Sequence, residues 1–313
     1  MEKRIDAENS MFIREQLESV KGEVFTQYPI GKYASLIPVD SSDDEGAEEV
    51  GYLQYDSIGA AEIIANGTTD SPAVDALVQK VLLPVKEIGN HFTWTTREVR
   101  NAALAQRNGN KRAKLDSTKL SIAATSHEQA HDKIAILGDG TKDRTFGGCY
   151  GIVFHPNVTK LEASDAWSDL TNAQILEEFA KMEEKIVVDT KEIYRPDTFA
   201  MDGALISFLR GRIIDGTTRT LYDVIRDTYS SYNFETHYAL KDVKKNPATG
   251  ASGATRVLLC YKKSPDVIRY KMPMAFKTEP AVFGGRDWRV ETSSTSAGVE
   301  VRQPLAVLVY YGF

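Results

Sequence analysis

The sequence predicts an α+β fold, with helical and strand-like stretches that follow one another along the chain. Over residues 116–137, Leu120 and Ala123 belong to a stripe of residues that recurs on one helical face. Towards the C-terminus the apolar spacing changes to period two, as in Ile268 and Tyr270, which is typical of strands. The 313 residues are 42% hydrophobic and 26% charged, so the chain can bury a sizeable core without disulfides.

Charge and cysteine content exclude several classes of protein. The chain has 38 Lys and Arg residues and 44 Asp and Glu residues, for a net charge of −6. This charge argues against a protein whose main function is electrostatic binding of nucleic acid. Cys149 and Cys260 are far apart and form no C-x-x-C pattern, so we expect reduced thiols and no cysteine zinc site. No apolar stretch reaches the roughly 18 residues of a membrane span, and we expect no membrane partner.

Residues 1–36 are predicted to form an N-terminal arm. Ser10 can cap a short helix in which Phe12, Leu17 and Val20 recur at helical spacing. Because so short an amphipathic helix is not stable alone in water, we expect it to lie on the rest of the molecule or on a neighbour.

The segment between Lys32 and Lys80 contains acidic residues and no basic ones. Strand-like stretches at 50–55 and 81–85, separated by turn signals such as Asn66-Gly67, predict a long β-hairpin. A solvated acidic loop is the ordinary interpretation of such a charge run. The length of about forty residues favours an arm that contacts a neighbouring subunit. No lysine occurs between Tyr33 and Gln79, so we expect noncovalent assembly. The ten carboxylates of this acidic segment, which we predict to contact a neighbouring subunit, are Asp40, Asp43, Asp44, Glu45, Glu48, Glu49, Asp56, Glu62, Asp70 and Asp75.

A basic region follows the acidic one. Thr95 and Glu98 form a capping box that starts a helix, and Asp116 is a plausible N-cap of the longer helix over 116–137. We expect the acidic arm of one copy to pair with the basic stretch of another. The basic residues of this predicted contact are Arg97, Arg100, Arg107, Lys111, Arg112, Lys114 and Lys119.

The second half of the chain alternates helices and strands before it becomes mostly β. Thr171 and Gln174 form a second capping box ahead of a helix. The further predicted elements are a strand at 198–200, helices at 202–209 and 221–229, strands at 234–240 and 257–261 around a flexible loop at 244–253, alternation from 268 to 276, and a closing strand at 305–311.

His127, Glu128 and His131 form a literal H-E-x-x-H motif on the predicted long helix, the pattern of zinc peptidases. Such an enzyme needs a third protein ligand and an open coordination position. The common extension would require Gly and His where the chain has Ile134 and Leu137. Both histidines also lie within the helix's inward stripe, so we favour a structural role and keep them as weak metal candidates.

Other catalytic templates are absent from the sequence. It contains no G-x-S-x-G or G-x-x-x-x-G-K motif, and the glycines near Gly138 do not fit G-x-G-x-x-G. His155 and His237 have no partner at ligand or nucleophile spacing. We therefore predict no enzymatic activity, no catalytic residues and no cofactor.

Short motifs, in their order, carry a resemblance to a known family. They are Ile37-Pro38-Val39-Asp40, Asp70-Ser71-Pro72-Ala73-Val74-Asp75, Glu98-Val99-Arg100-Asn101-Ala102-Ala103, Ile134-Ala135-Ile136-Leu137-Gly138-Asp139, Tyr194-Arg195-Pro196-Asp197-Thr198 and Val299-Glu300-Val301-Arg302-Gln303-Pro304. With the order of arm, acidic hairpin, long helix and β-rich end, the chain resembles the major capsid proteins of tailed phages with the Hong Kong 97-like fold, a superfamily that includes encapsulins.

The resemblance implies a division of the chain into five segments. These are an N-terminal arm at 1–36, an extended hairpin (the E-loop) with a flanking strand at 37–80, a peripheral domain at 81–196 with a spine helix at 116–137, an axial domain at 197–271, and strands at 272–313 that return to the peripheral domain. In this family the glutamate at the position of Glu128 has no metal chemistry.

The function implied by the resemblance is structural. Copies would assemble into pentamers and hexamers of an icosahedral phage head around double-stranded DNA, held without sequence specificity, with assembly in the bacterial cytoplasm and a final place in the virion. Portal, scaffold and decoration proteins stay open as further partners. An encapsulin-like compartment shell is one alternative, and a zinc metallopeptidase is a remote one.

Overall fold

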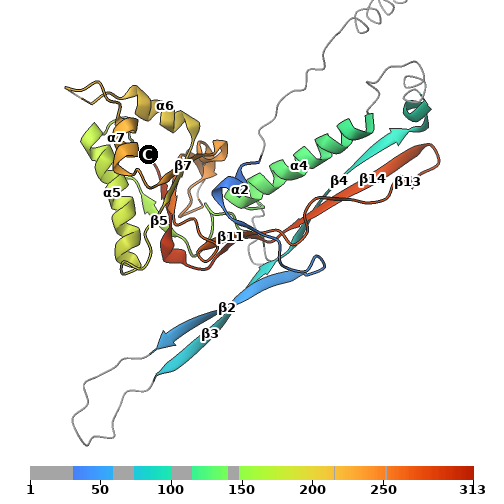
Figure 1. Cartoon of the computed structure of the whole chain (residues 1–313), viewed down its shortest axis with the longest axis horizontal. Helices are drawn as coiled ribbons and strands as arrows, with labels where there is room; N and C mark the ends of the chain where they lie inside the picture. The colour runs from blue at the N-terminus through green and yellow to red at the C-terminus, as the bar shows by residue number, and fades with distance from the viewer. Residues whose placement is uncertain (1–30, 59–73, 101–114, 140–147, 215, 251) are drawn as a thin grey trace, which may run out of the picture. The chain divides into compact units, whose positions relative to one another are not determined.

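The computed structural model describes residues 31–58, 74–100, 115–139, 148–214, 216–250 and 252–313 (Figure 1). Every structural statement below refers to these residues. The predicted helix of the N-terminal arm lies outside them.

A five-stranded sheet lies between two hydrophobic cores. Its order is β5 (Thr159–Glu162), β16 (Val307–Tyr311), β10 (Val257–Tyr261), β6 (Thr198–Met201) and β7 (Asn233–Thr236). All residues of β6, β10 and β16 are buried. Strands buried on both faces are nearly continuous apolar runs, and these three stretches have that composition.

Alternate residues of these strands enter two separate cores. Phe199, Leu258 and Tyr310 pack on one face with helices α5 (Asn172–Asp189), α6 (Gly203–Gly211) and α7 (Leu221–Thr228). Their neighbours Leu259 and Val309 face the other core, which also holds the short helix α2 (Tyr33–Leu36) and the end of α4 (Leu115–Leu137). The two-residue period of a strand therefore assigns each side chain to its core.

Side-chain caps start the helices. The predicted capping boxes at Thr171 with Gln174 and at Thr95 with Glu98 are both present. Thr220 with Asp223 forms a third box, and the Asp202 carboxylate accepts from two N–H groups at the start of α6. Each cap satisfies backbone donors that the helix cannot satisfy itself.

The predicted spine helix is α4, which begins at Leu115 and ends at Leu137, so Asp116 lies inside the helix and the prediction that it is the N-cap was wrong. Gly138 ends it with a φ of 85°, and a Cβ there would lie 2.7 Å from the Cys149 carbonyl oxygen. Only glycine tolerates this backbone and this close approach.

The helix α4 packs along a ribbon of two long strands, β4 (Lys86–Thr95) and β14 (Asp287–Ser296) (Figure 1). The ribbon is antiparallel and runs from the pair Asp287 and Thr95 to the pair Ser296 and Lys86. The short strands β12 (Lys277–Thr278) and β13 (Val282–Phe283) pair with the other edge of β14.

Two smaller sheets complete the described fold. A three-stranded sheet joins β1 (Val39–Asp40), β11 (Ile268–Lys271) and β15 (Gly298–Val301), with β1 parallel to β11. The predicted hairpin consists of β2 (Glu49–Ile58) and β3 (Asp75–Pro84), paired over ten residues of each strand.

Three predicted elements differ in the structure. The predicted strand 234–240 ends at Thr236, because the His237 side chain accepts from the Ala239 N–H and starts the 3-10 helix η2 (Tyr238–Leu240). The expected loop 244–253 contains a small hairpin of β8 (Val243–Lys245) and β9 (Ser252–Thr255). The alternation beyond Ile268 stops being a strand at Lys271, because both partner strands end there: Lys271 pairs with the last residue of β1, Asp40, and with the first residue of β15, Gly298.

The closing strand β16 also begins later than predicted, because residues 304–306 form the 3-10 helix η3 (Pro304–Ala306). It lies in the central sheet, beside strands from the segment expected to be the axial domain. The helix α5, from the segment expected to be peripheral, shares a core with α6 and α7. The division into five segments stays a prediction, and these contacts cross its boundaries.

Candidate functional site

Most described side chains of the β2–β3 hairpin are exposed, and only Val50 and Leu83 among them are buried. The root of the hairpin is fixed by a small apolar cluster of Val50, Leu83 and Ala297. The Tyr52 hydroxyl donates to the Val301 carbonyl at 2.9 Å. Towards the tip the side chains become exposed on both strands.

One face of the hairpin carries four exposed apolar side chains, and the exposed Lys80 lies opposite Leu53 on the same face. Tyr55 and Val78 lie opposite each other and are 68% and 51% exposed, and Leu53 and Leu82 on the same face are 53% and 44% exposed. Directly opposite and alternate residues share a face of an antiparallel pair. Within the part of the chain that the structure describes, all four side chains are exposed.

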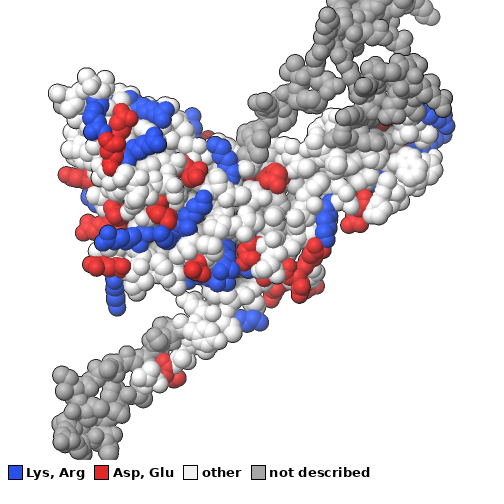
Figure 2. All heavy atoms as spheres, viewed as in Figure 1, with Lys and Arg blue, Asp and Glu red and all other residues white. Residues whose placement is uncertain are grey.

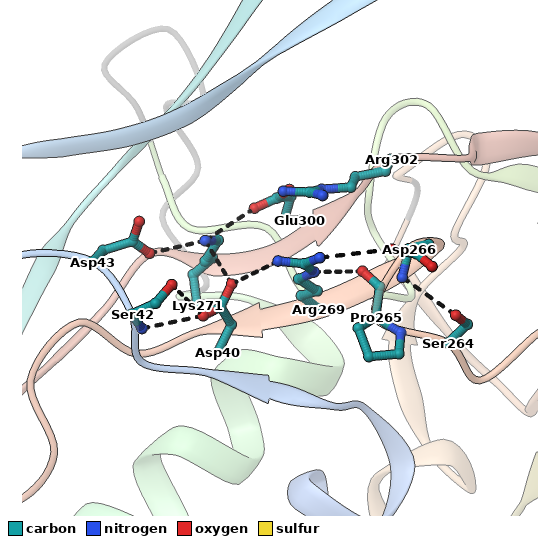
Figure 3. A network of polar contacts seen from close by, with 10 residues as sticks. All are labelled: Asp40, Ser42, Asp43, Ser264, Pro265, Asp266, Arg269, Lys271, Glu300 and Arg302. Atoms are coloured by element: carbon teal, nitrogen blue, oxygen red, sulfur yellow. Dashed lines mark hydrogen bonds and ion pairs between the residues drawn. The ribbon is translucent and has the colours of Figure 1, made fainter.

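A network of charged side chains lies at the hairpin's root (Figure 3). The Lys271 ammonium lies 2.8 Å from Asp40 and 2.9 Å from Asp43, and it reaches Glu300 at 3.6 Å. Arg269 also binds Asp40, at 3.0 Å, while Arg302 binds the other oxygen of Glu300. The network thus joins the chain just before the hairpin to strands β11 and β15.

Burial and pairing shift the ionisation of this network. Burial alone would raise the pKa of Asp40, but hydrogen bonds from Lys271 and Ser42 outweigh it and hold that pKa well below its usual range. Burial would lower the pKa of Lys271, and the bonds to Asp40 and Asp43 raise it instead. Both groups are therefore charged at neutral pH.

The structure divides the ten predicted acidic residues into groups. Asp40 and Asp43 pair inside the chain, and so does Glu45, with Lys277. The side chain of Asp56 is outside the description, as are residues Glu62 and Asp70. The remaining four, Asp44, Glu48, Glu49 and Asp75, are exposed.

The predicted basic residues are only partly described. Arg97 and Arg100 are exposed, and Lys119 pairs with Glu98 at 3.5 Å and donates to the Thr93 carbonyl. Arg107, Lys111, Arg112 and Lys114 lie outside the described residues. In the view of Figure 2 the surface over α4 carries few charges. The expected pairing of acidic arm and basic stretch between copies stays a prediction.

Sequence reasoning missed the cations that bind the start of the acidic segment. Arg269 and Lys271 are two apart in one strand, and Glu300 and Arg302 are two apart in and just after another. Charges at this spacing share a face of a strand. That pattern within otherwise apolar strands was the signal that could have identified the network.

The H-E-x-x-H histidines are both buried between α4 and β14. The ring nitrogens of His127 lie 2.7 Å from Ser294 Oγ and 3.1 Å from Thr292 Oγ1. Those of His131 lie 2.8 Å from the Tyr270 hydroxyl and 3.0 Å from Ser294 Oγ. Each ring nitrogen therefore has a hydroxyl partner. The hydrogen bonds to Thr292 and Ser294 hold α4 against β14.

Burial lowers the pKa of both histidines, and for His131 to about 4, with a further contribution from His127. Glu128 of the motif is exposed. In the part of the chain that the structure describes, no three His, Cys, Asp or Glu side chains converge in a way that could hold a metal ion. The described helices also include none that is long and apolar enough to cross a membrane.

Comparison with solved structures identifies the fold. The chain aligns with the capsid of Myoviridae phage XM1 with a TM-score of 0.76 and 19% identity, over 96% of this chain and 98% of that one. A structure from Mycobacterium phage Ogopogo aligns at 0.59 and 16% identity over 95% and 98% of the two chains. A virus-like particle from Pyrococcus furiosus aligns at 0.52 and 11% identity over 88% and 89%. The chain has the Hong Kong 97-like fold of tailed-phage capsid proteins.

A family model described as "Major capsid protein" matches residues 59–312. The chain belongs to the major capsid protein family and is a structural subunit of a capsid. The predicted resemblance is therefore confirmed. A comparison with curated protein sequences finds no match.

Proposed function

We propose that copies of this chain join into closed rings of five and six that build an icosahedral phage head around double-stranded DNA. Membership of the major capsid protein family supports self-association. The observation that carries the proposal is the exposure of the apolar side chains Leu53, Tyr55, Val78 and Leu82 on the hairpin. On a capsid subunit, we expect exposed apolar side chains of this kind to contact a neighbouring copy.

The hairpin would gain stability from contact with a neighbouring subunit. A two-stranded ribbon is marginally stable in water, and it gains from packing against another surface. Burial of an exposed Leu, Val or Tyr contributes about 1.5–3 kcal/mol at most. Each contact is modest, but a closed shell repeats it in every subunit, because a heterologous interface propagates around a ring.

The proposed role is structural and not enzymatic. A net charge of −6 suits a container in which packaged DNA is held without sequence-specific contacts, because like charges limit adhesion. The subunit would assemble in the host cytoplasm and end in the virion, where portal, scaffold or decoration proteins can join it.

Electron microscopy of the expressed protein tests the proposal. We expect closed icosahedral shells from the unaltered chain, and unassembled but folded subunits from a Tyr55→Ser, Val78→Ser double variant. Ile213→Ser is the matched control, since Ile213 is 60% exposed and lies away from the hairpin sequence. Shells of normal number and size from the hairpin variant would contradict the proposed contact.

A further inference from the structure

The hairpin needs contacts that fix its position, because the described side chains of its outer part are exposed. The apolar cluster at its root buries only Val50, Leu83 and Ala297, with Ala47 and Val85 at its margin. So small a cluster supplies little directional restraint, since apolar contacts are not directional. Hydrogen bonds and paired charges are directional and can supply it.

Glu300 links two cations of the charged network and is 1% exposed. One carboxylate oxygen binds Arg302, and the other lies 3.6 Å from Lys271. Lys271 in turn binds Asp40 and Asp43 just ahead of the hairpin (Figure 3). The carboxylate therefore connects the entry of the hairpin with strand β15.

Arg302 extends this connection into the hairpin itself. Its guanidinium carbon lies 5.6 Å from the centre of the Tyr52 ring, and the Tyr52 hydroxyl donates to the carbonyl of Val301 next to it. A guanidinium at this distance from an aromatic face is attracted to it. Asp40, Lys271, Glu300, Arg302 and Tyr52 thus form a continuous path from β1 through β11 and β15 to β2.

The charges on this path balance. The carboxylates Asp40, Asp43 and Glu300 face the cations Lys271, Arg269 and Arg302. Removing one buried member leaves another charge unpaired in a poorly solvated site. Buried ion pairs contribute little net stability compared with apolar residues, and their best-attested use is to specify one geometry.

We propose that Glu300 is a positioning residue for the β2–β3 hairpin. It acts through Lys271 and Arg302 to hold the chain ahead of β2 and Tyr52 of β2 in one arrangement, so that the exposed apolar side chains are presented to a neighbour in a single orientation. The inference deepens the proposed function and rests on it for the role of the hairpin in assembly.

Hydrogen exchange of the unassembled subunit tests the positioning. In Glu300→Gln we expect amides of residues 50–55 and 78–83 to exchange roughly tenfold faster, while amides of β10 and β16 keep their protection. Glu178→Gln is the matched control, because Glu178 is equally buried in the other core and binds Tyr310 and Lys181. The control should leave hairpin exchange unchanged.

Two outcomes would overturn the proposal. One is that amide exchange of the hairpin is unchanged in Glu300→Gln. The other is that amide exchange of the hairpin, β10 and β16 is accelerated equally, which would show that Glu300 stabilises the whole fold and does not position the hairpin. If Glu300→Gln does not fold, Tyr52→Leu decides instead, since it removes the ring and the hydroxyl but keeps all charges. Unchanged hairpin exchange in Tyr52→Leu would then refute the path.

Electron microscopy of the same variants separates this inference from the proposed function. A loosened hairpin together with fewer shells supports both. A loosened hairpin with normal shells supports the positioning role of Glu300 and counts against the hairpin as the assembly contact.

Discussion

The carboxylate of Asp132 lies 2.8 Å from Nε2 of His237, and both side chains are almost completely buried. The other oxygen of Asp132 accepts hydrogen bonds from the backbone N–H groups of Lys32 and Tyr33. One carboxylate on α4 therefore fixes both the start of α2 and the start of η2. Hydrogen bonds to the charged form, led by the one from His237, outweigh burial and lower the pKa of Asp132.

Asp132→Asn should lower the free energy of unfolding by about 2–4 kcal/mol. An amide presents one acceptor and one donor where the site offers donors on both sides, so one N–H would face another. Urea unfolding at neutral pH measures the change. Asp165→Asn, at an exposed carboxylate, should shift the value by less than about 0.5 kcal/mol, and an equal loss in both variants would contradict the assigned role.

The buried histidines predict a loss of stability in mild acid. Burial lowers the pKa of His131 to about 4, against 6.5 for the free side chain. Between these pH values the unfolded chain binds a proton that the folded chain does not, so the free energy of unfolding falls as pH drops, by up to about 3 kcal/mol for this residue. Urea unfolding at several pH values between 7 and 4 should show this fall.

The comparison variant for the pH effect is His131→Gln, which removes the titrating ring and should give a flatter dependence on pH. His91→Gln changes an exposed histidine of β4 and should retain the slope of the unaltered protein. An unchanged slope in His131→Gln would show that the acid sensitivity arises elsewhere.

Chelation should leave the protein unaffected. Because hydroxyl groups occupy the ring nitrogens of His127 and His131, we expect purified protein to contain far less than one zinc ion per chain. Dialysis against EDTA should leave the thermal unfolding midpoint unchanged. Stoichiometric zinc that disappears in a His127→Ala, His131→Ala double variant would revive the metallopeptidase alternative.

Two glycines of opposite environment provide a matched test of the turn after α4. Gly138→Ala places a Cβ against the Cys149 carbonyl at a positive φ and should cost about 2 kcal/mol or more. Gly203→Ala at the start of α6 meets nothing within 4 Å and should leave stability unchanged or raise it by up to about 1 kcal/mol. Denaturant unfolding of both variants makes the comparison.

The exposed acidic residues before and within the hairpin should affect assembly without affecting folding. Asp44→Lys, Glu48→Lys and Glu49→Lys together should reduce shell formation at low salt, because they reverse the charge expected to face a basic neighbour. Sedimentation and electron microscopy measure the assembled fraction, and urea unfolding checks the subunit. The control reverses three exposed acids elsewhere, Glu177, Glu184 and Glu192, and equal loss of shells in both would refute the arm's specific role.

Much of the fold was predictable because its signals are local. The periodicity over 116–137 and the caps at Thr95 and Thr171 correspond to helices in the structure. The lengths of several strands were not predictable, because a strand ends where its partner ends or where a side chain takes its backbone N–H. Strand β11, for example, ends at Lys271, where it pairs with the last residue of β1 and the first residue of β15.

The candidate site was predictable only in part. The hairpin follows from turn residues and from two strand-like stretches, but its ten carboxylates looked alike in the sequence. In the structure Asp43 binds Lys271, 228 positions away along the chain. Such a partner leaves no local trace, so the acids with an internal structural role could not be distinguished from the exposed ones.

By itself, the sequence determined the long helix, the acidic hairpin and the glycine turn that follows the helix, since each depends on neighbouring residues. The order of short motifs along the chain determined the membership of the family. The tertiary structure alone decided which side chains the H-E-x-x-H histidines bind and which carboxylates are buried. The reason is physical: the properties of an ionisable side chain are set by the groups that surround it in space, and for these residues those groups come from distant strands.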